Sequence, residues 1–264
     1  MIFSLRFNIP TKNSSMSTNI ERFKNACENG DLETVDELFS DVNNYVNMLE
    51  IRNIATKKGY LNIIEFLHKK GVDINELDNY QKNPLMIAAY KGWIDILDYL
   101  LLQEIDINIQ DSCGWTPLMF AAIREQTDVV DRLLQIKECK INISNNLGNT
   151  AIFFAVENEC LEIVDKLTVY GSDICHINKL GQTLVHIAAT SENPKVLERL
   201  LSFGLDINQQ DNDGWTPLIV CVRNNNKEGV KILLEHGADT TIKNNEGKKA
   251  SYYTQNDDIR NLLT

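Results

Sequence analysis

The chain lacks the features that place a protein in a membrane or direct it to secretion. Nothing in its 264 residues approaches the run of about 18 apolar residues that a membrane-spanning helix needs. Residues 1–10 are partly apolar, but they contain no continuous hydrophobic region, no small-residue cleavage site and no basic run. We therefore expect no membrane partner. We interpret residues 1–17 as a disordered leader, with Met16 as an alternative start.

Positive charge is also scarce. The chain has 26 Lys and Arg against 37 Asp and Glu, which gives a formal net charge of −11. A protein that binds nucleic acids in general carries a basic footprint. This balance predicts that the chain has no nucleic-acid partner.

Motifs that carry chemistry are missing too. The sequence contains no Gly-x-x-x-x-Gly-Lys, no Gly-x-Ser-x-Gly and no kinase signature. Cys175-His176 has no partner at the spacing of a zinc site. An enzyme would need an inserted site, and no repeat described below has an insertion large enough to hold one. We expect no catalytic residues, no cofactor and no metal.

The six cysteines never fall as Cys-x-x-Cys. Several stand at positions where equivalent segments carry Ala, Val or Ser. They are interpreted as reduced, structural or incidental thiols, which indicates the cytoplasm or also the nucleus. Cys113 is the thiol most expected to be exposed.

A period close to 33 residues runs through the chain. Its motif is fullest in Gly114-Trp115-Thr116-Pro117-Leu118, and successive copies are 33 or 34 residues apart. The position after Thr, or after the residue that replaces Thr, marks each copy of the motif. It is occupied by Pro84, Pro117, Ala151, Leu184, Pro217 and Ala250. Such a period is typical of a solenoid built from stacked supersecondary units.

Each repeat predicts two helices. Thr116 suits a helix N-cap and Pro117 suits the first helical position, so a helix begins there. Val129-Val130 and Leu133-Leu134 follow the spacing of one apolar face on a second helix. A glycine such as Gly171 then ends that helix where the chain turns with positive φ.

This unit resembles the ankyrin repeat, which reads roughly as Gly-x-Thr-Pro-Leu, two small residues, a loop, a Val/Leu-rich helix and Gly-Ala-Asp-x-Asn. The resemblance implies an all-α ankyrin-repeat solenoid of stacked helix-turn-helix units with β-hairpin fingers. It covers residues 18–264 as one domain. The domain would comprise an N-terminal capping repeat (18–44), six full repeats (45–77, 78–110, 111–144, 145–177, 178–210 and 211–243) and a truncated C-terminal cap (244–264).

Two departures and one agreement with the pattern bear on stability. Glu125, Glu159, Glu192 and Asn225 stand where glycine usually links the two helices. A non-glycine residue there costs on the order of 1 kcal/mol unless the loop takes another shape. Glu104 and Glu138 stand where glycine usually ends the second helix. His186 occupies the position where the family places a histidine that braces the start of the first helix, so we expect a scaffold role for it.

In ankyrin-like stacks the partner usually contacts the fingers and the first helices, which form a concave face. On the equivalent positions of this chain, basic residues outnumber acidic ones about three to one, although the whole chain is acidic. The resemblance thus implies a non-catalytic adaptor or scaffold that binds a protein with an acidic contact surface. The residues expected to bind it are Lys57, Lys58, Tyr80, Lys82, Tyr90, Lys91, Trp115, Arg124, Trp215 and Arg223.

Two alternatives stay open at this point. Trp115 and Trp215 are either exposed anchors of the binding face or rings that pack on the neighbouring finger. The chain is either an adaptor or a regulator of a larger machine, since a stack with little beyond its repeats also resembles gankyrin-like assembly chaperones of the proteasome. In both cases we expect a monomer.

Overall fold

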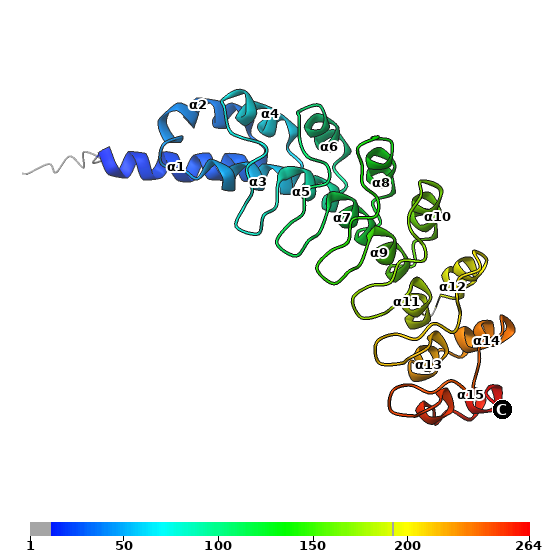
Figure 1. Ribbon diagram of the computed structural model, residues 1–264. Coiled ribbons are helices and arrows are strands. Elements are labelled where there is room, and N and C mark those ends of the chain that lie inside the picture. Colours follow the sequence, from blue (N-terminus) through cyan, green and yellow to red (C-terminus); the bar gives the residue numbers. More distant parts are fainter. Residues whose placement is uncertain (1–11, 192) are drawn as a thin grey trace, which may run out of the picture. The chain divides into compact units, whose positions relative to one another are not determined.

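The computed structural model describes residues 12–191 and 193–264, and most of its regular structure is helical (Figure 1). Contacts along the backbone divide the chain into two compact units, Met1–Ile105 and Asp106–Thr264. Each unit is built from antiparallel helix pairs, and each pair packs on the next. None of the helices in the described part is both long and apolar enough to cross a bilayer.

The first unit contains three helix pairs. Their bounds are α1 Lys12–Asn29, α2 Leu32–Val42, α3 Met48–Lys58, α4 Leu61–Lys69, α5 Pro84–Lys91 and α6 Ile94–Leu101. Helix α1 packs on α2 and α3, and α3 packs on α5. The helix begins at Lys12, within the stretch 1–17 that the sequence assigned to a leader, whereas residues 1–11 lie outside the described residues.

The second unit repeats the same arrangement. Its helices are α7 Pro117–Ile123, α8 Thr127–Leu134, α9 Ala151–Glu157, α10 Leu161–Val169, α11 Leu184–Thr190, α12 Pro194–Leu201, α13 Pro217–Arg223, α14 Lys227–Glu235, the 3-10 helix η1 Ala250–Tyr253 and α15 Asp257–Leu262. The first helices of successive repeats form one row, because α7 packs on α9, α9 on α11 and α11 on α13. Helix α13 then packs on η1, which closes the row.

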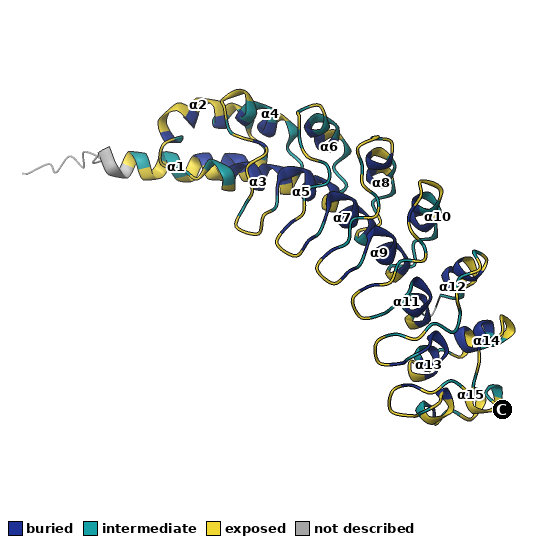
Figure 2. Ribbon diagram, viewed as in Figure 1, coloured by how far each residue is buried: buried dark blue, intermediate teal, exposed yellow. Residues whose placement is uncertain are grey.

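The helices begin where the capping residues predict. The Thr116 hydroxyl accepts a hydrogen bond from the Met119 N–H at 3.3 Å, and Pro117 fills the first helical position. Asn83 caps α5 in the same way. Apolar and small side chains behind these caps are buried between helices, as the dark faces in Figure 2 show. The small residues Ala121 and Ala122 are fully buried, which lets neighbouring helices approach closely.

The links between the two helices of a repeat adopt the left-handed conformation that the sequence predicted. Glu125, Glu159 and Asn225 have φ values of 55°, 60° and 56°. Glu192 lies outside the described residues. In the first unit the equivalent links are glycines, Gly59 and Gly92, which adopt this conformation without a steric penalty. The second unit therefore carries backbone strain at positions where the first has none.

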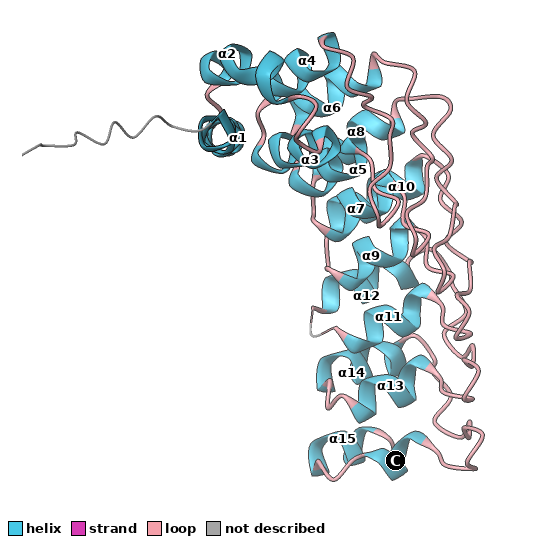
Figure 3. Cartoon of the chain, turned by 90° about the vertical axis from the view of Figure 1, so that its left-hand side faces the viewer, coloured by secondary structure: helices cyan, strands magenta, loops and turns pink. Residues whose placement is uncertain are grey.

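The fingers are tight turns, and their geometry differs from the expected β-hairpins. Among the described residues the one antiparallel bridge joins Lys243 and Lys249. Each finger is instead closed by a backbone hydrogen bond across five residues, for example from the Asp111 N–H to the Trp115 carbonyl at 3.0 Å. Figure 3 shows the loops of the second unit gathered on one side of its helices. The hydrogen bonds form too few ladder rungs for strands, because each finger is short.

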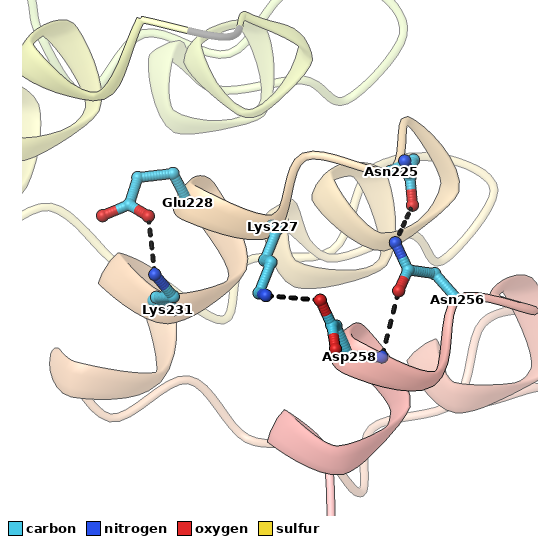
Figure 4. A network of polar contacts seen from close by, with 6 residues as sticks. All are labelled: Asn225, Lys227, Glu228, Lys231, Asn256 and Asp258. Atoms are coloured by element: carbon cyan, nitrogen blue, oxygen red, sulfur yellow. Dashed lines mark hydrogen bonds and ion pairs between the residues drawn. The ribbon is translucent and has the colours of Figure 1, made fainter.

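Polar contacts attach the last helix to the repeat before it (Figure 4). The Lys227 ammonium lies 2.6 Å from an Asp258 carboxylate oxygen, and the Asn256 amide donates to the Asn225 side chain at 2.8 Å. These groups are largely exposed to solvent, so each stabilises the contact only weakly. The buried side chain of Ile259 anchors α15.

Candidate partner-binding site

The fingers carry four of the candidate side chains, and an Asp or Asn at the start of each finger fixes the turn. The Asp111 carboxylate accepts hydrogen bonds from the N–H groups of Cys113 and Trp115, both at 2.9 Å. The same pair of bonds recurs at the start of five further fingers, at Asp78, Asn145, Asn178, Asp211 and Asn244. The residue at the tip is thereby held outward.

In the second unit, adjacent fingers are also bonded to each other. The Asn146 amide donates to the Ser112 carbonyl at 3.1 Å, and the Asn146 N–H donates to the Cys113 carbonyl at 3.0 Å. The Asn212 side chain makes the equivalent bond to the Lys179 carbonyl at 2.8 Å. These bonds set the spacing between tips, so the fingers form a rigid strip and not a set of independent loops.

Three predicted lysines lie on the first helices of two repeats in the first unit. Lys57 and Lys58 are in the last turn of α3, and Lys91 is in the last turn of α5. All three side chains are exposed, and in the part of the chain that the structure describes none forms an ion pair. A helix C-terminus favours positive charge, which explains their position. Their charge is available to a partner.

The tyrosines of the predicted set lie near these lysines. Tyr80, at a finger tip, is 69% exposed, and Tyr90 is 37% exposed. The Lys91 ammonium lies 5.9 Å from the centre of the Tyr90 ring. Lys82 is half-buried and is held by its backbone N–H, which donates to the Asp78 carboxylate at 2.9 Å. Lys82 therefore belongs more to the finger than to the exposed lysine group.

A groove of about 390 Å³ separates α3 from the finger that ends at Tyr80. We call it the first-unit groove. It is lined by Asn47, Leu49, Glu50, Asn53, Ile54, Lys57, Asp78, Asn79 and Tyr80. The structure thus brings the predicted Lys57 and Tyr80 to one site, whereas Lys58 does not line the groove.

Trp115 packs on aromatic side chains of the helices α7 and α9, and not on the neighbouring finger. Its ring stacks on Phe154 with centroids 4.2 Å apart, and it lies 5.3 Å from Phe120. Phe154 belongs to α9 of the next repeat, so the stack joins two repeats. The ring is half-buried. Arg124, the C-cap residue of α7, is exposed.

Trp215 and Arg223 lie together in the second unit. The Arg223 guanidinium carbon is 4.7 Å from the centre of the Trp215 ring, and the Tyr253 ring is 4.8 Å from it. Both predicted residues line a groove of about 480 Å³, the second-unit groove. Its other lining residues are Gln182, Thr190, Asp211, Asp213, Val220, Asn224, Asn245 and Glu246.

The second-unit groove is not basic, which differs from the excess of positive charge counted along the sequence. It holds three carboxylates against the single guanidinium of Arg223. The Asp211 carboxylate is occupied by the N–H groups of Asp213 and Trp215. The Glu246 carboxylate pairs with the Lys248 ammonium at 2.8 Å. The hydrogen bond and the positive charge of Lys248 hold the pKa of the Glu246 carboxyl below its usual value. In this groove, acidic side chains therefore outnumber basic ones.

His186 has the geometry expected of a scaffold residue. The Thr183 N–H donates to His186 Nδ1 at 3.2 Å, and Nε2 lies 2.9 Å from the Trp215 carbonyl oxygen. Because Nδ1 accepts, the proton is on Nε2 and is donated to that carbonyl. The side chain is buried, and burial lowers the pKa of His186 although the Trp215 carbonyl favours the charged form. The imidazole links one helix start to the next finger.

Burial disfavours the thiolate form of Cys27, Cys139 and Cys221. All six are free thiols. Burial raises the pKa of Cys27 and of Cys221 to about 12, with the charge of Glu28 adding to the shift at Cys27. Cys113 is exposed, as expected. Within the described residues no group of three or more His, Cys, Asp or Glu side chains could hold a metal ion.

Arg52 is a buried residue that the sequence did not single out. It is fully buried on α3, and its guanidinium donates to the carbonyls of Asp73 and Glu76. It also donates to the Asn53 side chain at 3.0 Å. In the next repeat the same position is held by Leu85, so an alignment of the repeats predicts an apolar residue. An arginine in an apolar position is the signal that would have identified it.

Comparison with known proteins agrees with this geometry. A family model described as ankyrin repeats (three copies) matches residues 23–111, 94–178 and 160–244. The chain therefore belongs to the ankyrin-repeat family, whose repeats generally mediate interactions between proteins. No curated protein sequence matches the chain.

Solved structures of ankyrin repeat domains are similar to it. The human ASB11 ankyrin repeat domain matches with a TM-score of 0.71 at 23% identity, over 80% of this chain and 95% of that one. The ankyrin repeat domain of Bcl-3, a member of the IkappaB family, matches with a TM-score of 0.68 at 22% identity, over 80% and 96%. These two likenesses show the fold alone.

A third structure is closer in sequence. It is a chain from the complex of the predatory endopeptidase Bd0816 of Bdellovibrio bacteriovorus with the immunity protein Bd3460. The match has a TM-score of 0.62 at 31% identity, over 71% of this chain and 98% of that one.

Proposed function

We propose that the chain is a non-catalytic adaptor that binds an acidic surface of a partner protein with the finger side of its first unit. The observation that carries this proposal is the group formed by Lys57, Lys58 and Lys91, whose exposed ammonium groups pair with no carboxylate in the described part of the chain. Unpaired charge of one sign attracts a complementary surface and speeds association.

The aromatic residues support the same face. Tyr80 and Tyr90 are exposed beside the lysines, and tyrosine is enriched among residues that dominate binding energy. In the 31% identical neighbour, the structure contains two proteins in one complex. The six free thiols support a reducing compartment, the cytoplasm or the nucleus.

A displayed library of random peptides, panned on the full chain at low salt, tests the proposal. We expect the selected peptides to be rich in Asp and Glu. The triple variant Lys57→Glu, Lys58→Glu and Lys91→Glu should slow their association about fivefold or more at low salt, as measured by surface plasmon resonance. The matched control reverses Lys69, Lys137 and Lys195, which are exposed on a second helix or in the turn that follows one.

Both triple variants change the net charge by the same amount, so a general electrostatic effect would slow association equally in both. Equal slowing, or the selection of neutral or basic peptides, would contradict the proposal. Affinity purification of the full chain separates the adaptor from the alternative of an assembly chaperone. A chaperone would be recovered with a single subunit of a larger complex and be absent from the assembled complex.

A further inference from the structure

We infer that the first-unit groove binds an extended peptide segment with opposite charges at its two ends and an apolar residue between them. This inference rests on the proposed function, because it specifies the partner segment that the finger side of the first unit takes. It adds a prediction that the proposed function does not make, namely a basic residue in an otherwise acidic partner.

The charged side chains of the groove are arranged along one stripe of α3. Glu50, Ile54 and Lys57 are spaced by four and three residues, so they lie on one face of the helix. Glu50 and Lys57 are seven residues apart, which corresponds to about 10.5 Å along the axis. A carboxylate thus stands at one end of the groove and an ammonium group at the other, with Ile54 in the middle.

Three of the remaining polar side chains of the groove already form hydrogen bonds within the chain. The Asp78 carboxylate accepts from the N–H groups of Tyr80 and Lys82, and the Asn53 side chain accepts from Arg52. Asn47 caps α3. Among the described residues neither Glu50 nor Lys57 has a side-chain partner. The groove therefore offers a partner the unpaired Glu50 carboxylate and the unpaired Lys57 ammonium group, with the hydrogen-bonded Asp78 carboxylate on the finger across from the helix.

Tyr80 forms the wall opposite the stripe. Its ring is 69% exposed and has no ring contact in the described part of the chain. With Leu49 and Ile54 it leaves an apolar centre between the two charges. A tyrosine side chain has only two rotatable angles, so it loses little conformational entropy on binding.

The dimensions fit an extended chain. Side chains on one face of an extended segment recur at every second residue, with about 3.3 Å between consecutive residues. Five residues with charges at the first and fifth positions and leucine at the third span about 13 Å, which matches the stripe once flexible side chains reach inward. The expected pattern is basic-x-apolar-x-acidic, in one chain direction or the other.

Four amidated and acetylated peptides test the inference: Lys-Ser-Leu-Ser-Glu, Glu-Ser-Leu-Ser-Lys, Lys-Ser-Leu-Ser-Lys and Glu-Ser-Leu-Ser-Glu. Each is titrated against the ¹⁵N-labelled full chain, and affinities are taken from amide shifts. We expect one of the two bipolar peptides to bind about fivefold more tightly than either like-charged peptide. The shifts should map to residues 47–57 and 78–80.

The variant that exchanges the charges, Glu50→Lys with Lys57→Glu, should prefer the other bipolar peptide. The exchange opposes the helix dipole and can destabilise α3, so a second variant, Glu50→Gln with Lys57→Gln, is needed. It should abolish the preference between the two bipolar peptides while circular dichroism shows the fold unchanged. The inference is overturned if the preference survives either variant, or if bipolar peptides bind no better than Glu-Ser-Leu-Ser-Glu. If bipolar peptides bind no better than Glu-Ser-Leu-Ser-Glu, the double variant Lys58→Glu, Lys91→Glu tests the proposed function separately. Loss of Glu-Ser-Leu-Ser-Glu binding in this variant would support the acidic-partner proposal.

Discussion

At the scale of single residues, the buried imidazole of His186 makes stability depend on pH. Its folded pKa is lowered, chiefly by burial, from a reference value of 6.5. Protonation would also place a proton on Nδ1 against the Thr183 N–H that donates to it. Between the folded and unfolded pKa values the unfolded chain binds more protons, so stability rises with pH. The contribution of His186 is therefore complete above about pH 6.5 and is lost as the pH falls toward the folded pKa.

We expect His186→Ala to lower the free energy of unfolding by about 1 to 2 kcal/mol at pH 7.5, because the bonds to Thr183 and Trp215 are lost. At pH 5.5 the difference from the wild type should shrink, because the wild type has by then lost part of its advantage. Urea denaturation followed by circular dichroism measures the free energy of unfolding of wild type and variant at each pH, and so the cost of the substitution at both.

His186→Gln is the matched control, since it keeps a polar side chain that does not titrate. A cost of His186→Ala that stays the same at both pH values would show that burial does not hold the imidazole neutral. A variant as stable as the wild type that no longer binds selected peptides would place His186 in the binding face.

The sequence predicted some residue roles and missed others for identifiable reasons. The brace formed by His186 follows from a repeat position, and its hydrogen bonds agree with it. Trp115 and Trp215 share a sequence motif, yet one stacks on Phe154 and the other lies against Tyr253 and Arg223. Phe154 and Tyr253 lie nearly 40 residues further along the chain than the tryptophans they contact, and the motif does not contain that information. Pairing also decides which lysines are free, and it is visible only in three dimensions.

At the scale of the elements, Arg52 fastens the loop that follows α4 to α3. Its guanidinium donates to the carbonyls of Asp73 and Glu76, which are the bonds that hold this loop to the helix. Burial lowers the pKa of the Arg52 guanidinium, while the charges of Glu76, Asp73 and Asp78 oppose the shift. Such a group is costly to bury, so its bonds have to be kept.

Arg52→Leu tests this role with the residue that the next repeat carries at the same position, Leu85. Two carbonyls lose a charged donor, so we expect the free energy of unfolding to fall by about 3 kcal/mol. Hydrogen exchange should speed up first in residues 73–77, ahead of the rest of the unit. Leu85→Met, a buried and apolar exchange of similar volume, is the control and should cost less than about 1.5 kcal/mol. An Arg52→Leu protein as stable as the wild type would mean that packing alone places the loop.

At the scale of the whole molecule, the repeat period defined the fold class and the positions of the helix pairs. It worked because the same capping residue, the same small residues and the same apolar face recur about every 33 residues. The helix that begins at Lys12 was missed because residues 12–19 carry no apolar face that the period could detect. The division into two units at Ile105 and Asp106 was missed as well, because this position lies inside a repeat that looks regular in sequence.

Nearest-neighbour coupling predicts how the chain responds to loss of its C-terminal cap. Deleting residues 247–264 removes η1 and α15, and with them the Tyr253 ring beside Trp215 and the Asp258 carboxylate beside Lys227. We expect faster hydrogen exchange in α13 and α14 and a red shift of the Trp215 fluorescence, assigned with Trp215→Phe. Residues 50–130 should keep their protection, because each repeat is held by its immediate neighbours. A truncated chain that lost protection throughout residues 50–130 would instead unfold as one cooperative body, and stability could then not be assigned to single repeats.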